Sequence, residues 1–118
     1  MNKVAFVILA DTESKGDLGR VVNALEAARE FVEADDDVHV IFDGAGTKWV
    51  PELREESHDY HDLYAAVEEE VSVCEYCADV FDVEDAITEA NRVSALAEYD
   101  GHPSIRSLLG DDYEIITY

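Results

Sequence analysis

The chain has 118 residues, of which 29 are acidic and 8 are basic, and its formal net charge at pH 7 is −21. A chain of this length can bury a core of its own, so we expect a single domain over residues 1–118. The strongly negative field repels phosphate backbones and argues against direct nucleic-acid binding. No apolar run approaches the length of a membrane span or forms a signal peptide, so we expect a cytoplasmic protein without membrane association.

The acidic residues are spread along the chain instead of being collected in a tail, and only three of the basic residues are lysines. Such an even acidic surface is typical of proteins from salt-loving microbes, in which concentrated salt screens the repulsion between like charges. We therefore predict a halophilic protein that loosens or unfolds in dilute buffer.

The first half of the chain alternates between strand-like and helix-like segments. Residues 4–9 form a continuous apolar run of strand length, which is typical of a strand buried on both faces. A loop over residues 10–16 follows, and Asp17 is a candidate cap for a helix whose apolar residues recur at the 3.6-residue period as far as Val32. Residues 38–42 form the second predicted strand.

Two loops at the ends of these strands are predicted to line a binding site. The loop after the second strand contains glycines that could cradle an anion, although it matches neither the dinucleotide fingerprint nor the P-loop. It also carries the chain's only tryptophan and one of its few lysines. If the strands are parallel, the loop after the first strand lies at the same edge of the sheet. The candidate binding residues in these two loops are Thr12, Lys15, Gly44, Gly46, Lys48 and Trp49.

The second half of the chain continues the alternation and indicates an α/β fold. We expect a three-layer sandwich in which a mostly parallel sheet of four or five strands carries helices on both faces, as in flavodoxin-like proteins. The segments expected after the second strand are a helix over 51–69 broken near Ser57, a strand ending at Cys74, helices over 78–81 and 83–93, an ambiguous segment over 94–101, a short helix from Pro103 and a last strand over 113–118.

Cys74 is the main candidate for chemistry. Val71 and Val73 read as the end of a buried strand, so Cys74 lies at the carboxyl end of that strand, where open α/β sheets bind their ligands. The amide N–H groups and the dipole of the following helix would favour a thiolate there. We therefore predict Cys74 as a nucleophile and Cys77 as a second functional thiol. The structural alternative is that both are small buried fillers of the core.

His58 and His61 precede the two cysteines with the spacing H-x2-H-x12-C-x2-C. This spacing is close to that of a zinc finger with the order of the histidine and cysteine pairs reversed. A zinc finger uses its metal to hold together a fold that is too small to have a core, and this chain needs no such help. We therefore expect no metal site and leave zinc as an open alternative.

Several segments resemble the DsrE-like family, which includes DsrE, DsrF and YchN-like proteins. The resemblance covers nearly the whole chain and is carried by the strand Val-x-Val-Cys74, Ala78 at the next helix, the turn Val83-Glu84-Asp85, the helix motif Pro103-Ser104-Ile105-x-x-Leu108-Leu109 and the terminal strand Tyr113-Glu114-Ile115-Ile116-Thr117-Tyr118. Relatives often carry a basic residue and a glycine shortly after the helix that follows the cysteine, where this chain has Phe81 and Asp82.

The resemblance implies a flavodoxin-like α/β sandwich that assembles into homotrimers or homohexamers. It also implies that Cys74 accepts sulfane sulfur as a persulfide from a donor protein and passes it to an acceptor protein. This chemistry needs no metal or organic cofactor. Two alternatives stay open, namely an oligomeric module that binds a small anion or thiol without catalysis, and a Cys-x-x-Cys dithiol oxidoreductase acting through Cys74 and Cys77.

Overall fold

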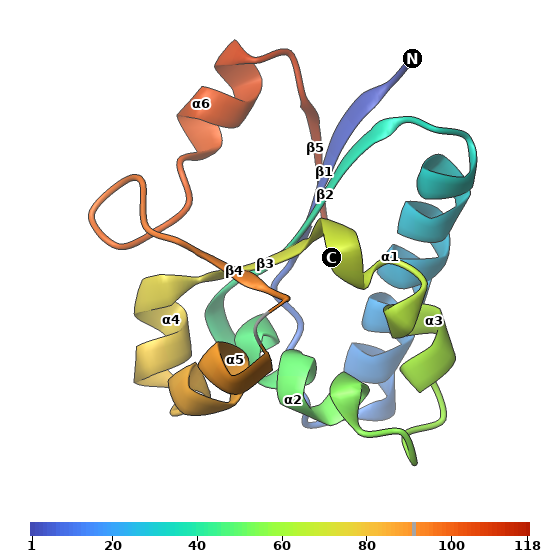
Figure 1. The fold of residues 1–118 in the computed structure, drawn as a ribbon, viewed down its shortest axis with the longest axis vertical. Helices are drawn as coiled ribbons and strands as arrows, with labels where there is room; N and C mark the ends of the chain where they lie inside the picture. Colours follow the sequence, from blue (N-terminus) through green and yellow to red (C-terminus); the bar gives the residue numbers. More distant parts are fainter. Residues whose placement is uncertain (91) are drawn as a thin grey trace.

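The computed structural model describes residues 1–90 and 92–118 and is built around one five-stranded sheet, with the strand order β4-β3-β2-β1-β5 (Figure 1). All four pairs of neighbouring strands are parallel, which confirms the predicted parallel α/β sheet. The strands are β1 (Lys3–Ile8), β2 (Asp37–Phe42), β3 (Val71–Cys74), β4 (Ser94–Leu96) and β5 (Glu114–Thr117).

Helices lie on both sides of this sheet, as predicted. Figure 1 shows the long helix α1 and the shorter α3 on one side, α6 on the other, and α2, α4 and α5 near one edge of the sheet. None of the described helices combines the length and the apolar composition that a bilayer crossing requires. The helices are α1 (Lys15–Glu33), η1 (Gly44–Lys48), α2 (Trp49–Arg54), α3 (His61–Ala65), η2 (Glu68–Glu70), α4 (Glu75–Val80), α5 (Glu84–Ala90) and α6 (Ile105–Gly110), of which η1 and η2 are 3-10 helices.

The main core lies between the sheet and α1. Strand β1 is flanked by β2 and β5, so it is buried along its length, and this explains its uninterrupted apolar sequence. Phe6 and Ile8 point into the same fully buried cluster as Val21 and Leu25 of α1. These α1 residues are four apart and therefore share one face of the helix.

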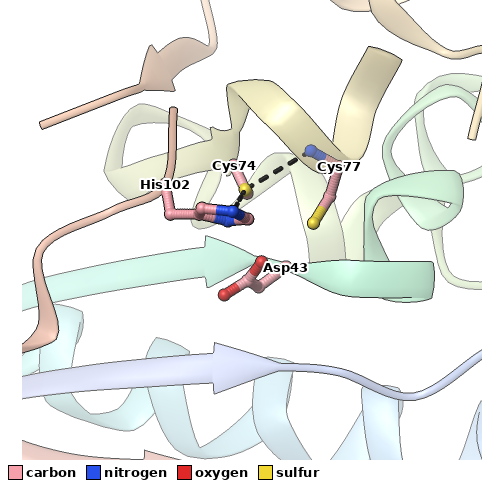
Figure 2. Close-up of side chains that lie close together, drawn as sticks. All are labelled: Asp43, Cys74, Cys77 and His102. Atoms are coloured by element: carbon pink, nitrogen blue, oxygen red, sulfur yellow. Dashed lines mark hydrogen bonds between the residues drawn. The ribbon is translucent and has the colours of Figure 1, made fainter. Parts of the chain in front are cut away.

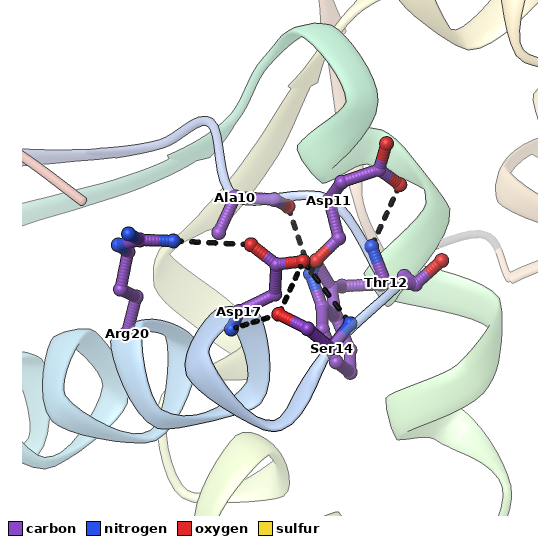
Figure 3. A network of polar contacts seen from close by, with 7 residues as sticks. Ala10, Asp11, Thr12, Ser14, Asp17 and Arg20 are labelled. Atoms are coloured by element: carbon purple, nitrogen blue, oxygen red, sulfur yellow. Dashed lines mark hydrogen bonds and ion pairs between the residues drawn. The ribbon is translucent and has the colours of Figure 1, made fainter.

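The start of α1 differs from the prediction. The cap is Ser14, and Asp17 is the third residue of a capping box, in which the Ser14 hydroxyl accepts a hydrogen bond from the Asp17 N–H while the Asp17 carboxylate accepts one from the Ser14 N–H. Asp17 also pairs with Arg20 at 3.1 Å (Figure 3). Ser14 and Asp17 are both residue types that favour a helix N-cap, and the helix begins directly after Ser14.

The segment between β3 and β5 also departs from its predicted boundaries. The expected helix over 83–93 is α5, which ends at Ala90, and Asn91 lies outside the described residues. The ambiguous segment 94–101 starts with the short strand β4, which pairs with β3 so that Leu96 lies opposite Cys74. The chain then turns back over the end of β3, which brings residues 99–102 to the cysteines.

Candidate functional site

Cys74 lies at the junction of β3 and α4, as predicted. It is the last residue of the strand and the N-cap of the helix, and its Sγ accepts a hydrogen bond from the Cys77 N–H at 3.4 Å. Because β2 and β3 are parallel neighbours, Asp43, which directly follows β2, lies at the same edge of the sheet. Cys74 is 0% exposed, whereas Cys77 is half-buried.

A tight turn over residues 99–102 covers this junction. Tyr99 and His102 exchange two backbone hydrogen bonds of 2.9 Å. The two central residues, Asp100 and Gly101, have φ angles of 52° and 87°. Positive φ at both central positions is typical of a type I′ turn, in which glycine and aspartate are the favoured residues.

The turn is held on the first residues of α4. The Tyr76 N–H donates to the Gly101 carbonyl at 3.0 Å, and the rings of Tyr76 and His102 lie with their centroids 4.7 Å apart. These contacts place Nδ1 of His102 3.3 Å from Sγ of Cys74. A thiol and an imidazole at this distance can share a proton, and the direction of transfer depends on the imidazole tautomer.

Four side chains converge here: Asp43, Cys74, Cys77 and His102. Figure 2 shows them approaching one another from three separate segments, namely the end of β2, the β3–α4 junction and the 99–102 turn. One polar atom from each of the four lies within 4.8 Å of the others. Both cysteines are free thiols.

The resting protonation state of Cys74 differs from the prediction. Burial raises the pKa of its thiol to about 12, and the negative charge of Asp43 acts in the same direction. The hydrogen bond from the Cys77 N–H lowers the pKa but does not compensate for burial. The predicted thiolate is therefore not favoured in the closed site, because burial disfavours the charged form of the thiol more than the Cys77 N–H stabilises it.

The predicted cationic residues do not supply free positive charge to the cysteines. The Lys48 ammonium pairs with the carboxylates of Asp11 and Glu13, and the Lys48 contact also lowers the pKa of the Asp11 carboxyl. Lys15 is exposed at the first position of α1, and the Thr12 N–H donates to the Asp11 carboxylate. Figure 3 shows Asp11 and Thr12 hydrogen-bonded in the loop after β1, next to the Ser14–Asp17 cap of α1.

Trp49 and Gly46 pack the segment after β2 against β1 and the loop that follows β1. The buried indole Nε1 of Trp49 donates to the carbonyls of Ala10 and Asp11, at 2.9 and 3.1 Å. Gly46 lies so close to β1 that an added Cβ would be 2.1 Å from the carbonyl oxygen of Ile8. Gly44 has a φ of 56°, a conformation that suits glycine. These contacts give the loop a structural role, and its binding role stays a prediction.

The histidines of the zinc-finger-like spacing bind the backbone near them. Nδ1 of His58 accepts the Tyr60 N–H at 3.0 Å, and Nδ1 of His61 lies 2.8 Å from the Leu53 carbonyl oxygen. The histidine that joins the cysteines is His102 instead. Sequence reasoning missed it and Asp43, although the Asp100-Gly101 pair is a turn signal and Asp43 follows a predicted parallel strand.

Comparisons with known proteins agree with this architecture. No protein-family model matches the sequence. A protein of Methanocaldococcus jannaschii described as "Uncharacterized protein MJ0733" is 29% identical over 115 residues, which cover 97% of this chain and 93% of that protein. Among solved structures, BT1422 from Bacteroides thetaiotaomicron, a conserved protein of unknown function, has a TM-score of 0.56 at 15% identity, covering 97% of this chain and 94% of the other.

The structure of the ychN protein from E. coli is also similar, with a TM-score of 0.65 at 16% identity and complete coverage of both chains. At this level of identity the likeness establishes the fold. The chain therefore has the ychN-like α/β fold, in agreement with the DsrE/YchN-like resemblance of its sequence.

Proposed function

We propose that this chain is a sulfur-relay protein that accepts sulfane sulfur as a persulfide on Cys74 and passes it to a partner protein. The observation that carries the proposal is the pairing of Cys74 Sγ with His102 Nδ1 at 3.3 Å, beside a second free thiol. A base next to a thiol is what a neutral, buried cysteine needs to become a nucleophile. The ychN-like fold and the sequence resemblance support the same chemistry.

In the loading step His102 takes the thiol proton from Cys74. The Cys74 thiolate attacks the terminal sulfur of a donor persulfide, a new S–S bond forms on Cys74, and the S–S bond of the donor breaks, so that the donor leaves as a thiolate. The Cys77 N–H, which already hydrogen-bonds Cys74 Sγ at 3.4 Å, stabilises the negative charge during the attack.

In the unloading step an acceptor thiolate attacks the outer sulfur of the persulfide and leaves Cys74 as a thiolate, which regains its proton from His102. Cys77 offers a second route, in which its thiolate attacks the inner sulfur, forms a Cys74–Cys77 disulfide and releases hydrosulfide. That disulfide must then be reduced by an external thiol before the next cycle.

Access to Cys74 requires the 99–102 turn to move away from α4 after His102 has taken the thiol proton in the closed arrangement. The turn is attached through the Tyr76–Gly101 hydrogen bond and the Tyr76–His102 ring contact. Tyr99 and Tyr76 are 73% and 55% exposed, and they offer an apolar surface around the site to a donor or acceptor protein. We place this relay in the cytoplasm, where free thiols persist, and in a homotrimer or homohexamer as the resemblance implies.

The proposal is tested by intact-mass measurement after incubation with polysulfide in molar salt and a metal chelator. We expect the wild type to gain the mass of one sulfur atom, which a reductant then removes. Cys74→Ala should gain none, whereas Cys77→Ala should still be labelled. His102→Ala should load at least about 100-fold more slowly, as expected for loss of a general base. Equal labelling of the wild type and Cys74→Ala contradicts the proposal.

A dithiol oxidoreductase is the second candidate, because the sulfur atoms of Cys74 and Cys77 lie within 4.8 Å and both are free. This function needs both cysteines, whereas persulfide loading needs only Cys74. Reduction of insulin disulfides by the wild type, lost in both single alanine variants, would favour it. A non-catalytic anion-binding module has less support, since Lys48 is already paired with Asp11 and Glu13.

A further inference from the structure

The four converging side chains contain the ligand types that zinc uses in proteins. Cys74 and Cys77 offer two sulfur atoms, His102 an imidazole nitrogen and Asp43 a carboxylate oxygen. Zinc is bound by these three kinds of atom, nearly always by four of them in a tetrahedron. The ligands come from segments that are far apart in the sequence, as in sites that tie a fold together.

The spacing of the four groups is close to that of a tetrahedral site. Zinc bonds of about 2.0 to 2.3 Å place neighbouring ligand atoms roughly 3.3 to 3.8 Å apart. Sγ of Cys74 and Nδ1 of His102 are already 3.3 Å apart, and all four ligand atoms lie within 4.8 Å of one another. The limit of 4.8 Å exceeds the tetrahedral spacing by about 1 Å, so the ligand atoms need to move together by at most about this amount to bind one ion.

Two of the ligands, Asp43 and His102, are also held in place by contacts with neighbouring groups that are not ligands, as is usual in metal sites. Oδ1 of Asp43 accepts the Gly44 N–H at 2.8 Å, which fixes the carboxylate at the end of β2. The ring of Tyr76 packs on the ring of His102 with centroids 4.7 Å apart and holds the imidazole over Cys74. Cys74 itself is fixed by β3, because it pairs with Leu96.

We propose that Asp43, Cys74, Cys77 and His102 form a binding site for one zinc ion. Binding ionises both thiols, so one Zn²⁺ enters and two protons leave, and the resulting site has a net charge of −1. Two thiolates and an imidazole select a borderline-soft ion such as zinc over magnesium or calcium, which prefer oxygen ligands. The formal charge of −21 raises the local concentration of cations around the chain.

Zinc binding goes beyond the proposed sulfur relay and competes with it, because a zinc-bound Cys74 thiolate cannot attack a sulfur donor. The ion also bridges the 99–102 turn to α4 and β2, so it holds the turn closed over Cys74. The zinc-loaded chain is therefore a form in which Cys74 cannot react, and removal of the ion restores the free thiol beside His102.

The test titrates Zn²⁺ alone into the chelator-treated, reduced full-length protein in molar salt, in competition with a chromophoric chelator and without any sulfur donor. We expect one ion per chain with a dissociation constant below about 1 μM and the release of two protons. Co²⁺ in place of Zn²⁺ should give the intense visible absorption and thiolate-to-metal charge transfer of a tetrahedral sulfur site.

The variants separate this site from other arrangements. Asp43→Asn retains the hydrogen bond to Gly44 and removes the anionic ligand, and Cys77→Ser removes one sulfur. Each should weaken zinc binding at least about tenfold, since even outer-shell changes at zinc sites have effects of this size. The matched control is His58→Asn, which keeps an acceptor for the Tyr60 N–H and should bind zinc like the wild type.

Failure to retain zinc under these conditions overturns the proposal, as does a spectrum without sulfur-to-cobalt charge transfer. Weakening by His58→Asn without any weakening by Asp43→Asn also overturns it, because the ion would then lie in the H-x2-H-x12-C-x2-C arrangement. Sulfur loading is measured separately in the presence of chelator, so the relay and the zinc site can each fail without the other.

Discussion

Replacing Gly46 by alanine should strongly destabilise the fold, because no room exists for a methyl group between η1 and β1. An added Cβ would lie 2.1 Å from the carbonyl oxygen and 2.9 Å from the carbonyl carbon of Ile8, both of them backbone atoms. The same carbonyl accepts the Asp43 N–H at 3.0 Å, so it cannot rotate away freely. Forcing η1 outward should cost about 3 kcal/mol, at the upper end of the range for overpacked cores.

Two other glycines provide controls with different expected results. Gly19 lies inside α1 with nothing within 4 Å of an added Cβ, so Gly19→Ala should stabilise the protein by about 0.5 to 1 kcal/mol through helix propensity. Gly44 has a φ of 56°, and an added Cβ would make only an ordinary contact with the Leu9 side chain at 3.7 Å, so Gly44→Ala should cost about 1 kcal/mol of backbone strain. The same chemical change is thus expected to have three different effects.

Urea unfolding in molar salt, followed by circular dichroism, measures these differences. A loss of 3 kcal/mol in Gly46→Ala corresponds to a fall of about 12 °C in Tm if each kcal/mol shifts it by about 4 °C. A Gly46→Ala variant within about 1 kcal/mol of the wild type would refute the close packing of η1 on β1.

Three further predictions concern the thiols, the surface charge and Trp49. In the reduced, chelator-treated protein, iodoacetamide should modify half-buried Cys77 before buried Cys74. The rate of Cys74 labelling should rise about tenfold per pH unit up to its pKa of about 12. Equal labelling rates for the two cysteines, measured by peptide mapping, would contradict the enclosed site. Because the net charge is −21, the Tm should rise steadily between dilute buffer and molar sodium chloride, and an unchanged Tm would count against a halophilic protein. Trp49→Phe removes the indole N–H that donates to the carbonyls of Ala10 and Asp11. Urea unfolding should show that the free energy of unfolding falls by about 1 to 2 kcal/mol. A fall of less than about 0.5 kcal/mol would argue against these hydrogen bonds.

The position of Cys74 could be predicted because it depends on short-range patterns. The β-branched residues Val71 and Val73 indicate a buried strand, and in a parallel sheet the residue after such a strand lies at the ligand-binding edge. The structure places Cys74 there. Its ionisation could not be predicted in the same way, since it depends on how completely the 99–102 turn excludes water.

The partners of the loop residues were also decided by long-range contacts. Lys48 was predicted to line a binding site, but in the structure its ammonium pairs with Asp11 and Glu13, which follow the neighbouring parallel strand β1. His102 is 28 positions from Cys74 in the sequence and reaches it only through β4 and a type I′ turn. No local periodicity in this segment indicates such a contact.

The sequence by itself determined the parallel α/β architecture, the place of Cys74 at a strand end and the strongly acidic surface, because these follow from residue periodicity, strand composition and charge counts. The tertiary structure decided which groups meet that sulfur, namely Asp43, Cys77 and His102, and which charges are already paired elsewhere. The physical reason is that burial and side-chain pairing are set by the relative positions of segments far apart in the chain, and these positions are fixed only when the sheet and its covering turn are assembled.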